Sequence, residues 1–479
     1  MLYDHIANRW LISQFASATG GAPITDECVA ISTTSDATGT YARYGFHLGS
    51  NFFDYPHLSV WPDGYYMSMN VFNSTGTSYL GPQAFVFDRA KMLANLPATF
   101  VSPRGPLGGT VDPFLPADLD GPTLPPSGAP ATFVGFPGQG TNPNYTTYHF
   151  HADFTTPANS TFTTFASPAA AGFTALCPTT RACVPQAGVV SSSNLDGIGD
   201  RLMFRLAYRK FGDHESVVGN YTVSAGGVAA VRWFELRNVT AGPVTVYQQS
   251  TYQPDTTWRW MGSAAMDGQG NLAIGFSASS STINPQLRYA ARLATDPINT
   301  LAQGEAHLFD GTGSQSGTSN RWGDYSSLTI DPVDDTTFWY TNEYYSTTGS
   351  FNWRTRIGSF KIASGSPTPT PTPTPTPAPD FSLSISPSTV TLHRGGGTAT
   401  YTVTITPSGG FSSTVQLSVS GLPSGTTGSF SPNPATTSSV LTLNVSSSTA
   451  PGSYPFTVSG TSGSLTHTAT AKLSKNNKP

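Results

Sequence analysis

The chain has 479 residues, a formal net charge of −4 and only 10% charged residues, whereas Gly (48 residues), Pro (39) and aromatic residues (12%) are abundant. This length exceeds one small core, and the composition favours an all-β protein of two or more domains with short strands and many turns. The absence of Lys and Arg clusters argues against nucleic-acid binding, and no apolar run approaches the ~18 residues that would cross a bilayer.

The first elements in the chain are short strands. Leu2-Tyr3-Asp4 has the character of a strand end, and Trp10 to Ala16 is predicted as the next strand. Residues 53–72, FDYPHLSVWPDGYYMSMNVF, contain two β-rich segments around a polar turn, which is typical of a β-hairpin. A short helical turn is expected at 88–95.

This hairpin recurs along the chain. Further copies are predicted at 131–154, 196–209, 259–277 and 321–345. Each is followed by another strand, and several by a fourth. A unit of about four strands that recurs every 40–70 residues indicates the blade of a β-propeller, because stacked blades cover each other's faces. We therefore expect a propeller of roughly six blades over 1–365.

The two ends of this predicted ring differ from the other blades. The last copy shows only three strands, and the first begins inside a blade. Propellers commonly complete the last blade with an N-terminal strand. We therefore expect a closing strand and a signal peptide upstream of Met1.

A second domain follows a repetitive linker. Residues 366–379, SPTPTPTPTPTPAP, favour polyproline II and predict a semi-rigid spacer of about 40 Å. Residues 380–479 alternate short β-rich segments with turns, which predicts an Ig-like β-sandwich. It has no Trp, so a glycan platform there is less favoured than a spacer, stabiliser or surface-attachment role.

Three cysteines and the surface composition indicate an exported protein. Cys177 and Cys183 bracket the short loop CPTTRAC and can close a small disulfide, which leaves Cys28 without a partner. The low Lys content, the Ser/Thr-rich surface and the Pro-Thr linker also suggest secretion or display on the cell surface.

Repeated Asp-Tyr pairs are the first candidates for chemistry. Asp54-Tyr55 and Asp324-Tyr325 fall where inner strands begin, which would bring carboxylates and phenols near the propeller axis. A carboxylate pair suits glycoside chemistry, one as acid and one as nucleophile or base. Glu343, in YTNEYY, is a third catalytic candidate. The alternative is structural, with turn caps, ion pairs and aromatic packing.

Several arginines are candidates for substrate binding. Arg201, Arg205 and Arg209 share one face of a predicted strand. Arg259 and Arg321 occupy matching places in two copies. Convergent guanidinium groups would bind an acidic sugar through paired hydrogen bonds. The alternative is that they form ion pairs between blades.

Two sets of residues are candidate metal ligands. His149, His151 and Asp153 alternate along YHFHADF, with His57 as a ligand from another blade or as a substrate contact. Loop aspartates are candidates for Ca²⁺, namely Asp118 and Asp120 together with Asp196 and Asp200. Structural histidines and turn caps are the alternatives to a divalent metal.

The copies DYPHLSVWPDG, RWMGSAAMDGQGN and RWGDYSSLTIDP resemble blades of secreted bacterial sialidase-like (BNR-type) β-propeller proteins. The C-terminal region resembles bacterial Ig-like modules of exported carbohydrate-active proteins. The turns WPDGYY, MDGQGN and DPVDDTTFW match the family's Asp-box, of the form S-x-D-x-G-x-T-W, only in part. No catalytic residue is therefore carried over from that family.

Two classes of function follow from these patterns. The first is a secreted glycan-directed protein, a glycoside hydrolase or polysaccharide lyase acting on a polysaccharide or glycoconjugate. The second is a non-catalytic extracellular binding or adhesion protein. The fold alone does not choose between them.

Overall fold

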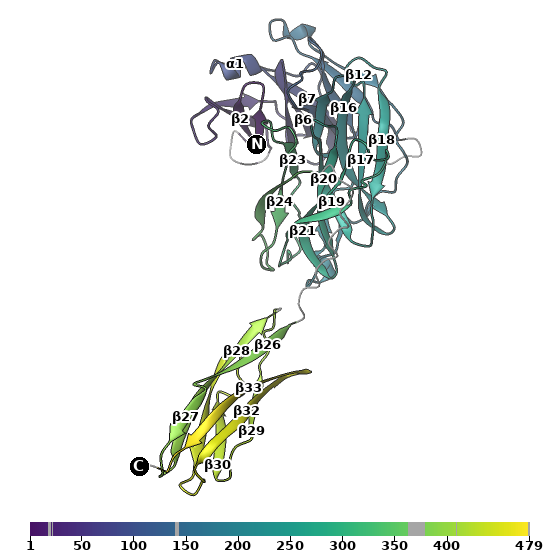
Figure 1. The fold of residues 1–479 in the computed structure, drawn as a ribbon. Helices are drawn as coiled ribbons and strands as arrows, with labels where there is room; N and C mark the ends of the chain where they lie inside the picture. The colour runs from purple at the N-terminus through teal and green to yellow at the C-terminus, as the bar shows by residue number, and fades with distance from the viewer. Residues whose placement is uncertain (18–20, 22, 139–142, 363–378, 409, 478–479) are drawn as a thin grey trace. The chain divides into compact units, whose positions relative to one another are not determined.

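The computed structural model describes residues 1–17, 21, 23–138, 143–362, 379–408 and 410–477, and the chain divides into two compact units, 1–370 and 371–479 (Figure 1). This division falls inside the predicted linker, of which residues 366–378 lie outside the described residues. No helix among the described residues is long and apolar enough to cross a membrane. Each unit is described by itself.

The first unit is a β-propeller built from antiparallel sheets, which we call blades and number 1 to 6 along the described chain. Blade 1 contains β1 (Leu2–Asp4), β2 (Arg9–Ala16), β3 (Asp26–Ser32) and β4 (Tyr41–His47), and blade 2 contains β5 (Phe52–Trp61), β6 (Gly64–Phe72), β7 (Tyr79–Phe87) and β8 (Phe100–Val101). Blade 3 contains β9 (Phe114–Asp120), β10 (Ala131–Gly135), β11 (Thr147–His151) and β12 (Thr161–Ala166).

The chain continues into the second half of the propeller. Blade 4 contains β15 (Met203–Lys210), β16 (Glu215–Ala225), β17 (Val228–Arg237) and β18 (Thr245–Tyr252), and blade 5 contains β19 (Trp258–Met266), β20 (Leu272–Ser280), β21 (Ile283–Arg292) and β22 (Glu305–Asp310). Blade 6 contains β23 (Ser327–Ile330), β24 (Phe338–Tyr344) and β25 (Arg354–Phe360). The prediction of roughly six blades is confirmed.

Short elements lie both between and within blades. Between blades 3 and 4, β13 (Ala182–Val184) pairs with β14 (Leu195–Asp196), with the single-turn helix η2 (Ser191–Ser193) between them in the sequence. Another single-turn helix, η1 (Pro157–Asn159), connects β11 to β12 within blade 3. After β7 the chain forms α1 (Arg89–Leu93), and the Asp88 carboxylate caps it by accepting from the Lys91 amide at 3.1 Å. The helical turn predicted at 88–95 is confirmed.

The first strands of blades 2 to 6 lie side by side and hold the propeller together. β9 and β15 pair in parallel, which joins blades 3 and 4 into one eight-stranded sheet. Side chains make the other links: Asp118 of β9 accepts from the Val60 amide of β5 at 2.9 Å, and Ser263 of β19 accepts from the amides of Arg205 and Leu328. The first strands therefore surround the axis in the order of the sequence.

The hydrophobic core lies between the blades rather than in one centre. Nearly every residue of the middle strands β6, β16 and β20 is buried, because a neighbouring blade covers each face of the sheet. At roughly 25 cal/mol per Å² of apolar surface, this burial is the main stabilising contribution. Both faces of these strands are consequently buried, including polar side chains such as Asn220 and Ser277.

Two of the predicted hairpin copies were placed wrongly. The copy at 131–154 supplies the second and third strands of blade 3, whose first strand is β9. The copy at 196–209 contains only the first strand of blade 4, which pairs with β16 further along the chain. Blade 1 has four strands from β1 onwards, and blade 6 has three among the described residues.

β5 contains a bulge near its start, at Tyr55 and Pro56. Asp54 pairs with Asn70 and His57 with Ser68, so Tyr55 and Pro56 together stand opposite Met69 and β5 has one extra residue here. Tyr55 has a φ of +58°, and Met261 in the matching bulge of β19 has a φ of +51°. Residues other than Gly rarely adopt a positive φ, and residues that do so are often found at functional sites.

The second unit is a sandwich of two four-stranded sheets. One sheet contains β26 (Asp380–Ser386), β28 (Gly397–Ser408), β31 (Ser438–Val445) and β30 (Thr426–Ser431). The other contains β27 (Thr389–Leu392), β33 (Leu465–Lys475), β32 (Gly452–Ser462) and β29 (Gln416–Ser420). Tyr401, Leu441 and Phe456 belong to the core that the sheets share. That the sandwich is specifically Ig-like stays a prediction.

Candidate functional site

The starts of the first strands of blades 2, 4 and 6 bring a cluster of aromatic side chains together, which we call the axial cluster. It consists of Tyr55, His57, Phe204 and Tyr325. The ring centres of Tyr55 and Tyr325 are 5.3 Å apart, and His57 lies 4.1 Å from Tyr55. Tyr55 is buried, whereas Tyr325 is 44% exposed. The two predicted Asp-Tyr pairs therefore do meet, through their tyrosines.

Arg201 packs directly on this cluster. Its guanidinium carbon lies 4.7 Å from the ring centre of Tyr55, a cation–π arrangement. Its Nε donates to Asp200 at 2.8 Å, and the Asp200 side chain is 46% exposed. Arg201 is thus held in place by a carboxylate that is itself open to solvent.

Three carboxyl groups around the axial cluster have different surroundings. Asp54 is half-buried and has no hydrogen bond or ion pair with any residue that the structure describes. Asp324 accepts from Arg321 Nη2 at 2.6 Å. Glu343 accepts from the Gly323 amide at 2.9 Å. Of the three catalytic candidates, Asp324 alone is held in an ion pair.

Burial changes the proton affinity of two of these groups. Burial raises the pKa of Glu343 to about 7, and the charge of Asp324 adds to this while the Gly323 amide opposes it. Burial also raises the pKa of Asp324, but Arg321 and Arg201 counteract it. Glu343 therefore exchanges a proton near neutral pH, as a general acid or base requires.

A disulfide-closed loop borders the same region. Cys177 and Cys183 are bonded, as the sequence allowed, and Cys28 is a free, exposed cysteine. Arg181, inside this loop, binds Asp196 at 2.9 Å and is close enough to Asp324 to lower the pKa of its carboxyl. The loop thus adds positive charge beside the axial cluster.

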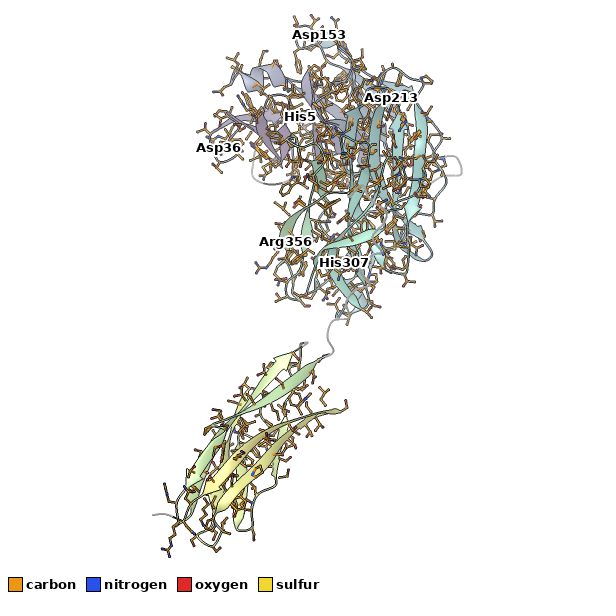
Figure 2. The ribbon with its side chains drawn as sticks, in the orientation of Figure 1. His5, Asp36, Asp153, Asp213, His307 and Arg356 are labelled. Atoms are coloured by element: carbon orange, nitrogen blue, oxygen red, sulfur yellow. A yellow bond between two sulfur atoms is a disulfide. The ribbon has the colours of Figure 1, made fainter. Side chains whose placement is uncertain are left out.

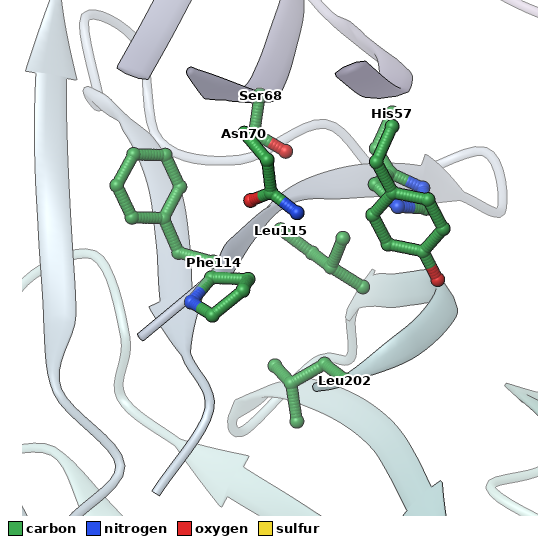
Figure 3. A pocket seen from close by; sticks show the side chains of 8 residues that line it. His57, Ser68, Asn70, Phe114, Leu115 and Leu202 are labelled. Carbon is green, nitrogen blue, oxygen red and sulfur yellow. The ribbon is translucent and has the colours of Figure 1, made fainter. Parts of the chain in front are cut away.

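His57 packs against the rings of Tyr55 and Tyr325. It also lines a recess that includes Ser68 and Asn70 (Figure 3). It is 2% exposed, and neither ring nitrogen has a hydrogen-bond partner among the described residues. Burial lowers the pKa of His57 to about 3, so the ring stays neutral. His57, predicted as a substrate or metal contact, is thus a neutral buried ring that packs against Tyr55 and Tyr325.

Arg205, a predicted substrate contact, lies in a buried network of ion pairs. It is 2% exposed, its Nε donates to Asp118 and its Nη1 to Asp120, both at 2.9 Å. Nη1 also reaches the Leu328 carbonyl of blade 6 at 3.1 Å. Asp118 and Asp120 lie on β9 rather than in a Ca²⁺-binding loop, and they neutralise this arginine.

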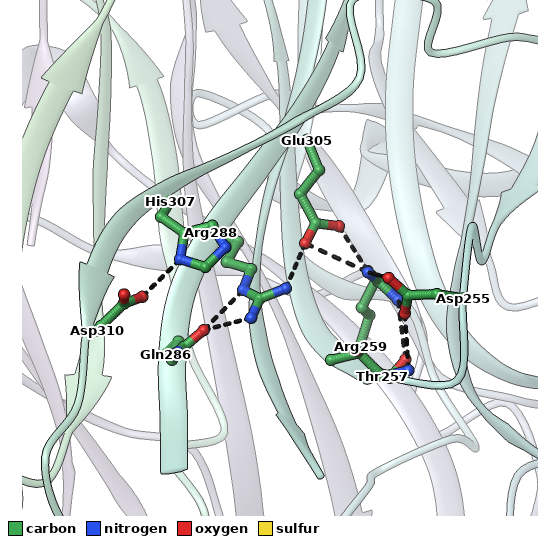
Figure 4. Close-up of polar contacts among 8 residues, drawn as sticks. All are labelled: Asp255, Thr257, Arg259, Gln286, Arg288, Glu305, His307 and Asp310. Atoms are coloured by element: carbon green, nitrogen blue, oxygen red, sulfur yellow. Dashed lines mark hydrogen bonds and ion pairs between the residues drawn. The ribbon is translucent and has the colours of Figure 1, made fainter. Parts of the chain in front are cut away.

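Arg259, another predicted substrate contact, is likewise part of a buried network. Its Nε donates to Glu305 at 2.6 Å and its Nη1 to Asp255 at 2.9 Å (Figure 4). Arg288 shares Glu305 at 2.7 Å. Arg209 is similarly paired, with Asp335 at 2.6 Å. The alternative of ion pairs between blades describes Arg205 and Arg209, whereas the Arg259 pair with Glu305 lies within blade 5.

The predicted metal site at His149, His151 and Asp153 is wrong. His149 Nε2 bonds the Val239 carbonyl at 2.8 Å, and its ring stacks on Phe165. Asp153 accepts from the backbone amides of the turn that follows it. Asp196 and Asp200 are paired with arginines, and the described part of the chain contains no group of three side chains suited to a metal.

Glu27 was missed by the sequence reasoning. It is fully buried on β3, burial raises its pKa to about 8, and its charge influences the phenol of Tyr325. A signal was present, since Glu27, Val29 and Ile31 alternate and so share one face of the strand. An acidic residue in an otherwise apolar face is an uncommon position.

Comparison with known proteins gives similarities of structure only. No protein-family model matches the sequence, and no curated protein matches it. A phage phi92 endosialidase has a TM-score of 0.43 and 9% identity, covering 76% of this chain and 66% of its own. A Trypanosoma rangeli sialidase has a TM-score of 0.35 and 11% identity, covering 75% of this chain and 53% of its own.

A third similar structure is an ulvan lyase described as a new family of polysaccharide lyase. It has a TM-score of 0.36 and 10% identity, covering 97% of this chain and 91% of its own. The chain thus spans about two thirds of the endosialidase and about half of the sialidase. These identities are too low to transfer an activity or a residue role.

Proposed function

We propose that the propeller acts on an extracellular polysaccharide at the axial cluster, as a glycoside hydrolase or lyase. The observation that carries the proposal is the exposed ring of Tyr325, which lies near Asp54 and Asp324 and packs against Tyr55, the ring that Arg201 contacts. An exposed aromatic ring offers a flat apolar face together with a hydroxyl group. Such a surface suits a sugar ring, and Arg201 adds a contact for an acidic sugar.

The chemistry requires a proton donor and an acceptor at the reacting bond. Glu343, with a pKa of about 7, supplies the proton near neutral pH, and Asp54 is a carboxyl with no competing partner among the described residues. In a hydrolase these groups would serve as the acid and the base or nucleophile. In a lyase, the acceptor would remove the proton next to the uronate carboxylate.

We infer that the protein is exported. The Cys177–Cys183 disulfide supports this, because disulfides persist in oxidising compartments. The Pro-Thr segment and the C-terminal sandwich would then hold the propeller near a surface or a polymer. A count of free thiols in protein isolated from its native host tests this, since a reduced Cys177–Cys183 pair would contradict export.

A non-catalytic role is the second candidate, and specific contacts favour it. Asp324 is paired with Arg321, and Arg201 with Asp200, so part of the cluster is already neutralised. A binding protein needs the aromatic and arginine contacts but no free acid and base. In this role, Tyr325 and Arg201 would bind the polymer and Glu343 would only support Gly323.

The test is a panel of neutral and acidic polysaccharides assayed for new reducing ends and for unsaturated uronates. Glu343→Gln and Asp54→Asn should each lower kcat by roughly 10²-fold or more, as expected for loss of an acid or base. Because the protonated Glu343 is the acid, the rate should fall as the pH rises through about 7. Asp36→Asn, on an exposed loop of blade 1, is the matched control (Figure 2).

The outcomes separate the two candidates. Unsaturated products identify a lyase, and reducing ends without unsaturation identify a hydrolase. Activity that survives both carboxyl substitutions contradicts the site assignment. Binding without any cleavage, weakened by Tyr325→Ala but unchanged in Glu343→Gln, establishes the non-catalytic role instead.

A further inference from the structure

A second concave site lies between blades 4 and 5. It is a cleft of about 240 Å³ bordered by the turn after β15, the ends of β17 and β21, and the turn after β19. The axial cluster lies at the starts of the first strands, whereas this cleft lies at the ends of two of them. The two sites are therefore at opposite ends of the blades. Asp213, on the first of these turns, is labelled in Figure 2.

Arg292 in this cleft is a buried cation without a carboxylate partner. It is 2% exposed, its Nη2 donates to the Asp296 carbonyl at 2.6 Å, and its Nε has no partner among the described residues. No described carboxylate lies within ion-pair distance of it. Burying a cation without a counter-charge costs several kcal/mol.

The other buried arginines show how unusual this is. Arg205, Arg209 and Arg259 each bind at least one carboxylate at 2.5–2.9 Å. Burial lowers the pKa of Arg292, and the more distant charges of Glu235 and Asp296 only partly compensate. The fold therefore holds one guanidinium group ready for an anion that the described residues do not provide.

A second guanidinium group lines the same cleft. Arg237 Nε donates to Glu235 at 2.7 Å, and the guanidinium carbon lies 3.3 Å from the ring centre of Tyr247. The Glu235 carboxylate is shared with Ser216 and Gln248. Tyr247 is 40% exposed, so Arg237 is fixed on an aromatic surface at the rim.

We propose that this cleft binds an oxyanion group, the carboxylate or sulfate of an acidic ligand, between Arg292 and Arg237. Planar guanidinium groups suit both oxyanions because they donate two parallel hydrogen bonds. The exposed side of Tyr247 would contact the body of a ligand that carries the anion. The site is separate from the axial cluster and does not depend on catalysis there.

The test is calorimetric titration of the full chain at fixed ionic strength with sodium sulfate, sodium glucuronate and, as a neutral sugar, methyl glucoside. Sulfate or glucuronate should bind saturably, and methyl glucoside should not bind at this cleft. Tighter binding of glucuronate than of sulfate indicates a sugar acid, and the reverse indicates a free inorganic oxyanion. Absence of saturable binding by either anion overturns the proposal.

Variants assign the binding to this cleft. Arg237→Gln, at the rim, should weaken anion binding by roughly tenfold or more, since charged hydrogen bonds contribute about 1.5–3 kcal/mol. Arg292→Gln should abolish it, with circular dichroism to confirm folding. Arg354→Gln, an exposed arginine of blade 6, is the matched control and should bind normally. Asp54→Asn, at the other end of the blades, should leave anion binding at this cleft intact. Unchanged anion affinity in Arg237→Gln overturns the proposal.

Discussion

At the scale of single residues, the buried carboxyl of Glu27 should make the stability of the fold depend on pH. Its folded-state pKa of about 8 exceeds the ordinary value of 4.5, because the carboxyl is buried. The folded state therefore retains a proton that the unfolded state has lost between these values. The stabilisation is complete below the unfolded pKa and is lost as the pH rises through the folded pKa.

Replacing Glu27 with Gln removes this titration. Between about pH 5 and pH 8, the free energy of unfolding of the parent chain should fall relative to that of Glu27→Gln, by up to roughly 1.4 kcal/mol for each pH unit. Urea unfolding across this range measures it. Asp36→Asn on the same blade is the control, because hydrogen bonds from the amide and the hydroxyl of Thr38 lower the pKa of Asp36, so that it does not titrate in this range. Parallel pH curves for Glu27→Gln and the parent would contradict the prediction.

At the scale of elements, the contribution of the disulfide loop to stability can be tested separately from the rest of the candidate site. The loop closes over a sequence separation of only 6 residues and carries Arg181, which binds Asp196. Constraining a short loop in the unfolded chain contributes about 2 kcal/mol. The bond therefore stabilises the segment that leads into β15 and the axial cluster.

A cysteine series tests this contribution. Cys177→Ser combined with Cys183→Ser should lower the free energy of unfolding by about 2 kcal/mol, and reductant should then have no further effect. Cys28→Ser is the matched control, because Cys28 is free and its removal leaves the loop closed. The prediction fails if reductant destabilises the double variant as much as the parent chain.

The elements also show what the sequence could predict. The hairpins β5–β6, β19–β20 and β23–β24 were predicted because alternation and turn residues are local signals. β9 was missed because its Pro116, Asp118 and Asp120 are typical of a loop. Only pairing with Arg205, 85 residues from Asp120, makes these aspartates suitable for a buried strand. Such distant compensation leaves no local pattern.

In the candidate site, too, local patterns could be predicted from the sequence and distant contacts could not. The matching places of Tyr55 and Tyr325 in two copies of the repeat predicted that both lie near the axis, but not that their rings are in contact. The partners of the arginines were not predicted, because Arg201 contacts the Tyr55 ring and pairs with its neighbour Asp200, whereas Arg205, four residues further on, pairs with aspartates of another blade. Burial depends on which blade lies opposite, and a period of two residues assigns only the face.

At the scale of the whole propeller, Arg205 connects blades 3, 4 and 6 near the axis. Its guanidinium group binds two aspartates of β9 and the Leu328 carbonyl of β23. Packing between neighbouring blades is a nearest-neighbour interaction. Arg205 adds a contact between blades that are not neighbours in the sequence, and so couples their unfolding.

This coupling predicts a specific pattern of unfolding. Arg205→Met leaves Asp118 and Asp120 buried without a counter-charge and should cost about 3–5 kcal/mol, with a broader calorimetric transition as the blades separate. Adding Asp118→Asn and Asp120→Asn should recover part of the loss, because neutral amides need no cation. Arg354→Met, an exposed arginine of blade 6, should change the unfolding free energy by less than about 0.5 kcal/mol. If the triple variant were no more stable than Arg205→Met, the cost would come from lost packing at the axis rather than from unpaired charge.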